Sequence, residues 1–346
     1  MWNRQGNTNT QIMVKEREYW IDAIRTFACL CVIMTHAPIP STGGGRIAVP
    51  IYNFIAIGGA SILFFMVSGA LILYKQQEFV PFMKKRLSRI VLPMVIWTII
   101  SLFVAYMEGK IRLEEIWDKV IMIPFIPQVG TYWFIYVIFG IYLLTPIIST
   151  WLTNTRKREV EYALCVWGLT LLLPFLENTP FNHMISYTGG YLYYFYGYLW
   201  FAILGFYLRK YINIKKHKSR WMIVPVGTIA IVFAIYPTNI IPHDILQNRM
   251  AIHVVLMAVC YFLIIKHLHL PQKIKLFVYT FAQHSFGIYL IHILVMRSIL
   301  WPLLEPLQIN HIIAIPLITL LTASISFLIV WAIGKIVPYS KYIVGV

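Results

Sequence analysis

A series of long apolar blocks, separated by short polar segments, constrains this chain more than any other feature of its sequence. A helix needs about 20 mainly apolar residues to cross a hydrocarbon layer about 30 Å thick. Blocks of about that length cover residues 19–38, 52–74, 88–107, 130–152, 159–177, 190–209, 220–237, 249–267, 278–300 and 310–337. The sequence therefore predicts an all-α integral membrane protein with about ten transmembrane helices.

The composition agrees with this pattern. Of the 346 residues, 59% are hydrophobic and 12% are charged, and the mean hydropathy is +0.72. A soluble domain carries roughly 25% charged residues. These values exclude an ordinary soluble enzyme and a disordered chain.

The charges are strongly unbalanced, with 29 Lys and Arg against 13 Asp and Glu, a formal net charge of +16. When successive loops are assigned to alternate sides, one side holds 22 of the basic residues and the other holds four. Basic residues are enriched in cytoplasmic loops, so both termini are expected in the cytoplasm and no nucleic-acid partner is expected.

The domain organisation follows from these spans. We expect a cytoplasmic N-terminal segment (1–18), a transmembrane domain (19–337) and a cytoplasmic C-terminal tail (338–346). The first apolar block lacks the small-residue cleavage site of a secretory signal, so it is expected to be an uncleaved span.

Three polar residues lie inside the first span: Asp22, Arg25 and His36. A charged group inside a span costs about 2.5 kcal/mol or more on insertion scales, so such residues are candidates for function. Asp22 and Arg25 are three residues apart and can pair on one face. Arg25 and His36 are eleven apart, which returns to within about 20° of the same direction. All three are expected to face one interior channel.

His36 and His292 are expected at the same depth. His36 lies about 24 Å along its helix from Trp20, and His292 about 21 Å from Val278. Both positions fall towards the outer side. A functional pair is one interpretation, and the other is that each histidine bonds a backbone carbonyl between packed helices.

Arg86 and Arg89 lie three residues apart where the third span meets the cytoplasm. Two guanidinium groups on one face can bind phosphates bidentately. They are equally typical of the basic flank that anchors a helix end, and the spacing alone leaves both interpretations open.

Other polar and aromatic groups carry weaker signals. Trp133 and the tyrosines of 191–198 could stack on a sugar ring or form an interfacial belt. A zinc site from His36, His253 and His292 lacks a helical ligand motif such as HExxH, so no metal is expected.

Two segments carry expectations about packing. Small residues at Ser68 and Gly69 are expected to allow close helix contact. The outer segment 108–129 mixes charges with an apolar face of Ile116, Val120 and Ile123 and is expected to lie in the membrane interface.

Five motifs in order resemble the acyltransferase-3 family of integral membrane O-acyltransferases. They are the Asp22-x-x-Arg25 opening with His36 eleven residues after Arg25, Phe64-Phe65-Met66-Val67-Ser68-Gly69, Arg86-Leu87-Ser88-Arg89-Ile90-Val91-Leu92-Pro93, Tyr132-Trp133-Phe134 and Ser285-Phe286-Gly287-Ile288-Tyr289-Leu290-Ile291-His292. The second motif departs from the family pattern, since Ala70 replaces the usual Phe. The resemblance extends over essentially the whole chain and favours the stand-alone members, which have no fused extracytoplasmic esterase-like domain.

This resemblance implies a multi-pass protein of the bacterial cytoplasmic membrane that moves an acyl group, with acetyl expected, from cytoplasmic acyl-CoA to a hydroxyl of a cell-surface glycan, lipid-linked sugar or similar acceptor. No tightly bound cofactor is implied, because acyl-CoA is a substrate. The implied catalytic residues are His36, Asp22 and Arg25, and Arg86 and Arg89 would hold the donor. His292, Trp133 and Tyr132 would line the acceptor side.

The role of His36 and two rival functions stay open. His36 either acts as general base or carries the acyl group itself. A transporter or flippase for a lipid-linked glycan or small polar solute is the alternative function, although no pair of interrupted spans occupies corresponding positions of two halves. A channel is less favoured, since no filter motif such as TVGYG occurs.

Overall fold

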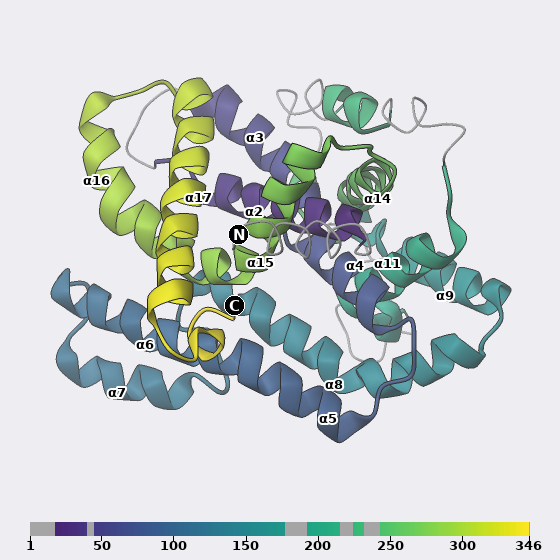
Figure 1. Ribbon diagram of the computed structural model, residues 1–346. Helices are drawn as coiled ribbons and strands as arrows, with labels where there is room; N and C mark the ends of the chain where they lie inside the picture. Colours follow the sequence, from purple (N-terminus) through teal and green to yellow (C-terminus); the bar gives the residue numbers. More distant parts are fainter. Residues whose placement is uncertain (1–17, 40–44, 177–191, 215–223, 232–242, 346) are drawn as a thin grey trace, which may run out of the picture.

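The computed structural model describes residues 18–39, 45–176, 192–214, 224–231 and 243–345 (Figure 1). Within these ranges the regular elements are helices and no strand occurs. The longer elements are α2 (Tyr19–His36), α3 (Gly45–Gly59), α4 (Ser61–Ile72), α5 (Phe79–Arg86), α6 (Leu92–Met107), α7 (Leu113–Met122), α8 (Trp133–Asn154), α9 (Lys157–Thr170), α11 (Leu199–Tyr211), α14 (Ile252–Lys266), α15 (Gln272–Leu294) and α17 (His311–Ile336). Two π-helical segments, Leu87–Val91 and Val295–Leu300, and the short helices α13 (His243–Leu246) and α16 (Trp301–Leu304) complete the main elements.

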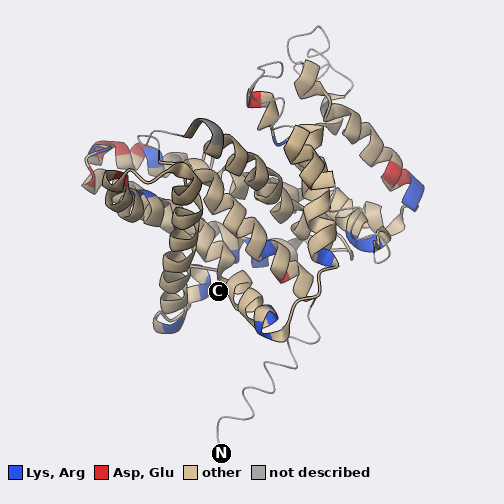
Figure 2. Cartoon of the chain, turned by 90° about the horizontal axis from the view of Figure 1, so that it is seen from above, with Lys and Arg blue, Asp and Glu red and all other residues tan. Residues whose placement is uncertain are grey.

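Six helical stretches in the described part of the chain are long and apolar enough to cross a membrane. They are Ala48–Ile72, Phe79–Met107, Gly130–Asn154, Lys157–Leu176, Gln272–Leu307 and His311–Ile336. The predicted first, sixth and eighth spans correspond to the shorter or more polar helices α2, α11 and α14. Most of the predicted seventh span and of the N-terminal segment lies outside the described residues. Charged residues are sparse along the helical ribbons, as Figure 2 shows, and the chain is a multi-pass membrane protein.

Helix α2 lies at the centre of the bundle and runs parallel to α15 (Figure 1). The contacts between the two helices join residues with a nearly constant offset in sequence. Near the helix starts, the Tyr19 hydroxyl donates to the Leu268 carbonyl at 2.9 Å, and the Thr26 hydroxyl donates to the Val278 carbonyl at 3.3 Å. At the far end, the His36 and His292 rings lie together. The register brings residues about 250 positions apart in sequence to the same depth.

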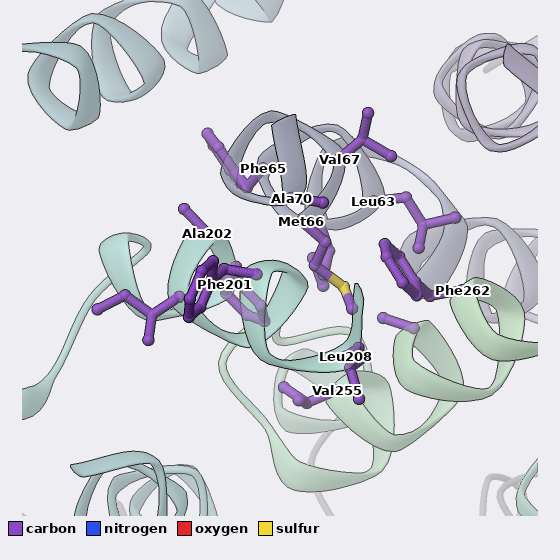
Figure 3. Packing of buried hydrophobic residues seen from close by; sticks show 14 of the residues in the cluster. Leu63, Phe65, Met66, Val67, Ala70, Phe201, Ala202, Leu208, Val255 and Phe262 are labelled. Carbon is purple, nitrogen blue, oxygen red and sulfur yellow. The ribbon is translucent and has the colours of Figure 1, made fainter. Parts of the chain in front are cut away.

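Small residues let α4 and α11 pack at very short range. A Cβ atom placed on Gly69 would lie 1.9 Å from the Ala202 carbonyl oxygen, and one on Gly205 would lie 1.9 Å from the Met66 carbonyl oxygen. Figure 3 shows this contact, with Met66 of α4 facing α11 and Phe262 nearby on α14. The expectation of close packing at Gly69 is confirmed, and its cause is direct backbone contact between the two helices.

The predicted span 52–74 is divided into α3 and α4 at Ala60. Gly59 ends α3 against α2, because a Cβ atom there would lie 2.6 Å from the Cys31 Sγ atom. The small residues at this break allow α3 to approach the central helix before α4 continues towards α11.

The outer segment packs differently from its sequence pattern. The apolar face around Val120 and Ile123 is turned into the protein core. A second apolar stripe, formed by Leu113, Trp117 and Ile121 of α7, is exposed. It is this stripe, at the i, i+4 and i+8 positions, that is available to a membrane interface.

The described part of the C-terminal tail packs onto the bundle. The Trp97 indole donates to the Ile343 carbonyl at 2.9 Å, and Val344 is fully buried. Gly345 has a φ of +74°, the left-handed region that favours glycine, and it lies beside Phe286.

Candidate functional site

One cavity of about 360 Å³ is lined by His36, and it is named the outer cavity here after the side that the sequence predicts for this histidine. His36, the last residue of α2, lies on its wall with Trp133 at the start of α8 and Arg297 of the second π-helical segment. Glu108, which follows α6, also lines it. Hydrogen bonds from Lys110 and Ser298 lower the pKa of the Glu108 carboxyl below its ordinary value, so this group is charged at neutral pH.

His36 and His292 form a pair with ring centroids 5.7 Å apart. His292 is completely buried and does not line the outer cavity, so it lies behind His36. Its Nδ1 atom is 2.6 Å from the Tyr289 carbonyl oxygen, which can only accept, so Nδ1 carries the proton. The Nε2 atom is then an acceptor, and it has no hydrogen-bond partner among the described residues.

An inner cavity of about 440 Å³ holds three arginines, Arg25, Arg86 and Arg89. Arg89 lies in the π-helical segment Leu87–Val91, and Arg86 immediately precedes it. The Arg86 guanidinium carbon lies 5.2 Å from the Phe82 ring centroid and 5.0 Å from that of Tyr142. Its Nε atom is buried, and no described residue forms a hydrogen bond with it. Such π-helical insertions occur frequently at functional sites.

A thin aromatic wall separates the two cavities. Trp133 and Leu290 line the outer cavity, and their chain neighbours Phe134 and Tyr289 line the inner one. The Phe134 and Tyr289 rings pack edge to face, with their centroids 5.7 Å apart. The Tyr289 hydroxyl donates to the carbonyl of Thr131, which lines the outer cavity. On two elements, adjacent residues therefore line different cavities.

The remaining predicted residues fall at different places. Asp22 is buried within α2, at 1% exposure. Arg25 lies on the inner cavity, so it shares no cavity with His36. Tyr132 is also buried, and its hydroxyl donates to the Leu290 carbonyl at 2.6 Å.

His253 stands apart from the histidine pair. Its Nε2 atom is 2.9 Å from the Leu246 carbonyl oxygen, and its ring lies between Phe54 and Phe175. Across the described residues no group of three His, Cys, Asp or Glu side chains is arranged to hold a metal ion. The geometry therefore offers no zinc site at these histidines.

Two arginines near the outer cavity were not predicted as site residues. Arg297 lines this cavity, and the Arg249 guanidinium carbon lies 5.1 Å from the Trp133 ring centroid. The sequence signal that could have found Arg297 is the cost of a cation within an apolar span. Arg249 stands at the edge of the predicted span 249–267, where a basic residue is also typical of a helix flank, and it reaches Trp133 only through the tertiary fold.

Fold and site together define a helical membrane protein with a cationic inner cavity and a histidine-bearing outer cavity on opposite sides of a thin wall. The model of the acyltransferase-3 family, an acyltransferase domain, matches residues 18–333. The chain belongs to this family and is a membrane acyltransferase. Comparison with curated proteins and with solved structures gives no significant match.

Proposed function

We propose that the protein is an O-acyltransferase of the bacterial cytoplasmic membrane. It transfers an acyl group, with acetyl expected, from cytoplasmic acyl-CoA to a hydroxyl of a cell-surface glycan, lipid-linked sugar or similar acceptor. The observation that carries this proposal is the pair of cavities, since three arginines line one, His36 lines the other, and adjacent residues of two elements line both.

The inner cavity suits the donor. Guanidinium groups bind phosphates through paired, charge-assisted hydrogen bonds. Arg86 is held between two aromatic rings with an unused buried Nε atom, so its side chain is ordered before a ligand arrives. In this proposal Arg86 and Arg89 hold the phosphates of CoA, and Arg25 adds positive charge deeper in the cavity.

The outer cavity suits the acceptor. His36 as general base takes the proton of the acceptor hydroxyl while the oxygen attacks the thioester carbonyl carbon. The carbon–oxygen bond forms and the carbon–sulfur bond breaks, so the products are an ester and CoA, whose thiolate takes up a proton. His292 positions His36 rather than contacting the acceptor, because it is buried behind that ring.

A two-step version of this chemistry uses the same geometry. In that version the His36 ring nitrogen takes the acyl group from the thioester, and the acceptor hydroxyl then displaces the imidazole. Incubation of the protein with radiolabelled acetyl-CoA alone separates the versions, since only the two-step route labels the protein.

The first experiment measures donor binding and acetyl transfer separately. Detergent-purified protein should gain thermal stability from acetyl-CoA by mass action. His36→Ala should keep that gain, yet lose about 100-fold or more of the alkali-labile acetyl transferred to surface glycan in membranes of gene-deleted cells. His284→Ala, a histidine of α15 that lines neither cavity, is the matched control and should transfer normally.

Two results would contradict the proposal. Full transfer by a folded His36→Ala protein would remove the general base. Absence of any stabilisation of the wild-type protein by acetyl-CoA would favour the transporter or flippase alternative, which has no need of this donor.

A further inference from the structure

Two guanidinium groups stand beside the outer cavity, each on an aromatic face. Arg297 lines the cavity, with its guanidinium carbon 5.4 Å from the Trp301 ring centroid. Arg249 lies over Trp133, which lines the same cavity. Stacking on an indole holds the plane of a guanidinium and leaves its N–H groups available at the edge.

Neither arginine is neutralised by a carboxylate of the described residues. In the described ranges, no carboxylate lies within ion-pair distance of Arg249 or Arg297. Glu108 is the acidic residue on this cavity, and its carboxylate is 2.5 Å from the Lys110 ammonium. The Nε atom of Arg249 is buried and has no hydrogen-bond partner within the part of the chain that the structure describes.

Both positive charges lie near the position where the acceptor hydroxyl would react. Arg297 shares the wall of the outer cavity with His36, and Arg249 lies over the Trp133 ring of the same wall. Unpaired cations at a span are costly, and they usually mark a substrate path or find a partner of opposite charge. A neutral sugar would leave both charges uncompensated, whereas an anionic one would neutralise them.

We propose that the acceptor carries a carboxylate or phosphate group close to the hydroxyl that is acylated, and that Arg297 and Arg249 bind this anion. The inference rests on the proposed function, because it names the acceptor class of the same site. It assigns Arg297 and Arg249 to acceptor specificity, separately from the three arginines of the inner cavity.

The test uses full-length protein in detergent and three sugar probes. Tryptophan fluorescence reports binding, since Trp133 and Trp301 carry the two guanidinium groups. The probes are methyl glucuronide, glucose 1-phosphate and the neutral methyl glucoside. We expect at least one anionic sugar to bind about tenfold or more tightly than the neutral one, and the tighter of the two identifies carboxylate or phosphate.

Variants test whether the preference for anionic over neutral sugars depends on the two arginines. Arg297→Gln and Arg249→Gln should each reduce the ratio of anionic to neutral affinity towards one, and Arg297→Lys should retain part of it. Arg112→Gln is the matched control, because Arg112 is an exposed outer arginine that is paired with Glu115 and lines no part of this cavity. It should keep the wild-type ratio.

Two outcomes overturn the inference. They are equal or undetectable binding of all three sugars to the wild-type protein, and an unchanged preference for anionic sugars in both glutamine variants. Stabilisation by acetyl-CoA is measured on the same samples. If it persists while the anion preference fails, only this inference falls, and if it is absent from wild type, the proposed function falls.

Discussion

At the scale of single residues, the histidine pair has the most specific geometry. His292 donates from Nδ1 to the Tyr289 carbonyl, and its unpartnered Nε2 atom belongs to the ring that faces His36. This arrangement suits a group that fixes the orientation of the neighbouring imidazole. A second histidine used only to fill space would need no free nitrogen.

Substitutions of His292 can separate its two nitrogens. His292→Asn keeps a donor near the Nδ1 position, and His292→Gln places an amide near the Nε2 position. If Nε2 orients His36, we expect kcat to fall about 10-fold to 100-fold in the asparagine variant and less in the glutamine variant, with KM for acetyl-CoA unchanged. Steady-state kinetics measure kcat and KM for each variant, and a pH–rate profile shows whether the protonation of His36 has changed.

The affinity for acetyl-CoA serves as the control for this prediction, because a positioning role for His292 leaves it unchanged. A merely structural role for His292 would change KM, kcat and thermal stability together in both variants. Equal losses in the two variants would therefore contradict a positioning role for Nε2.

Substitutions can distinguish the roles of Arg86 and Arg89 from that of the neighbouring basic residue Lys85. Both line the inner cavity, whereas Lys85 is exposed and lines neither cavity. We expect Arg86→Gln and Arg89→Gln each to weaken acetyl-CoA binding about tenfold, by loss of charge-assisted hydrogen bonds. Lys85→Gln should bind normally in the same calorimetric titration. Equal affinity in all three variants would return the arginines to a helix-anchoring role.

At the scale of elements, the contact between α4 and α11 depends on two glycines. A Cβ atom at Gly69 meets backbone, which cannot rotate away as a side chain can. We expect Gly69→Ala to destabilise the protein by about 1–3 kcal/mol or more, the range for overpacking. Thermal unfolding in detergent measures the effect.

Gly140 of α8 is the matched control for this contact. A Cβ atom there would meet nothing within 4 Å, so Gly140→Ala should leave stability unchanged or slightly raised. Equal melting temperatures for the two alanine variants would show that α4 and α11 separate at little cost.

At the scale of the whole molecule, the proposed function predicts that the aromatic residues between the cavities keep water and donor apart until an acceptor is present. The Phe134 ring centroid lies 4.7 Å from that of Phe65 and 5.7 Å from that of Tyr289. We expect Phe134→Ala to open the wall and raise acceptor-independent hydrolysis of acetyl-CoA several-fold, since excluding water suppresses this side reaction. Release of free CoA measures it.

Phe103→Ala is the comparison for the wall. Phe103 is 56% exposed on α6 and lines neither cavity, so its loss should not change hydrolysis. A low and equal hydrolysis rate in both variants would mean that Phe134 does not separate the cavities.

The sequence by itself determined the class of protein and the depth of its polar residues. Apolar block length dictates helices that can cross a bilayer, and the rise per residue places His36 and His292 at one level. The family motifs then indicated an acyltransferase, and the family match agrees. These inferences succeed because they depend on local composition and helical periodicity.

Only the tertiary structure decided which polar residues share a cavity. Arg25 and His36 lie on one helix at nearly the same angle, yet they face different cavities at different depths, and Phe134 and Tyr289 line only the cavity of Arg25. Arg249 reaches Trp133 across more than 100 residues of sequence. Such contacts depend on how helices cross, and helix crossing is set by backbone approach at small residues such as Gly69 and Gly205.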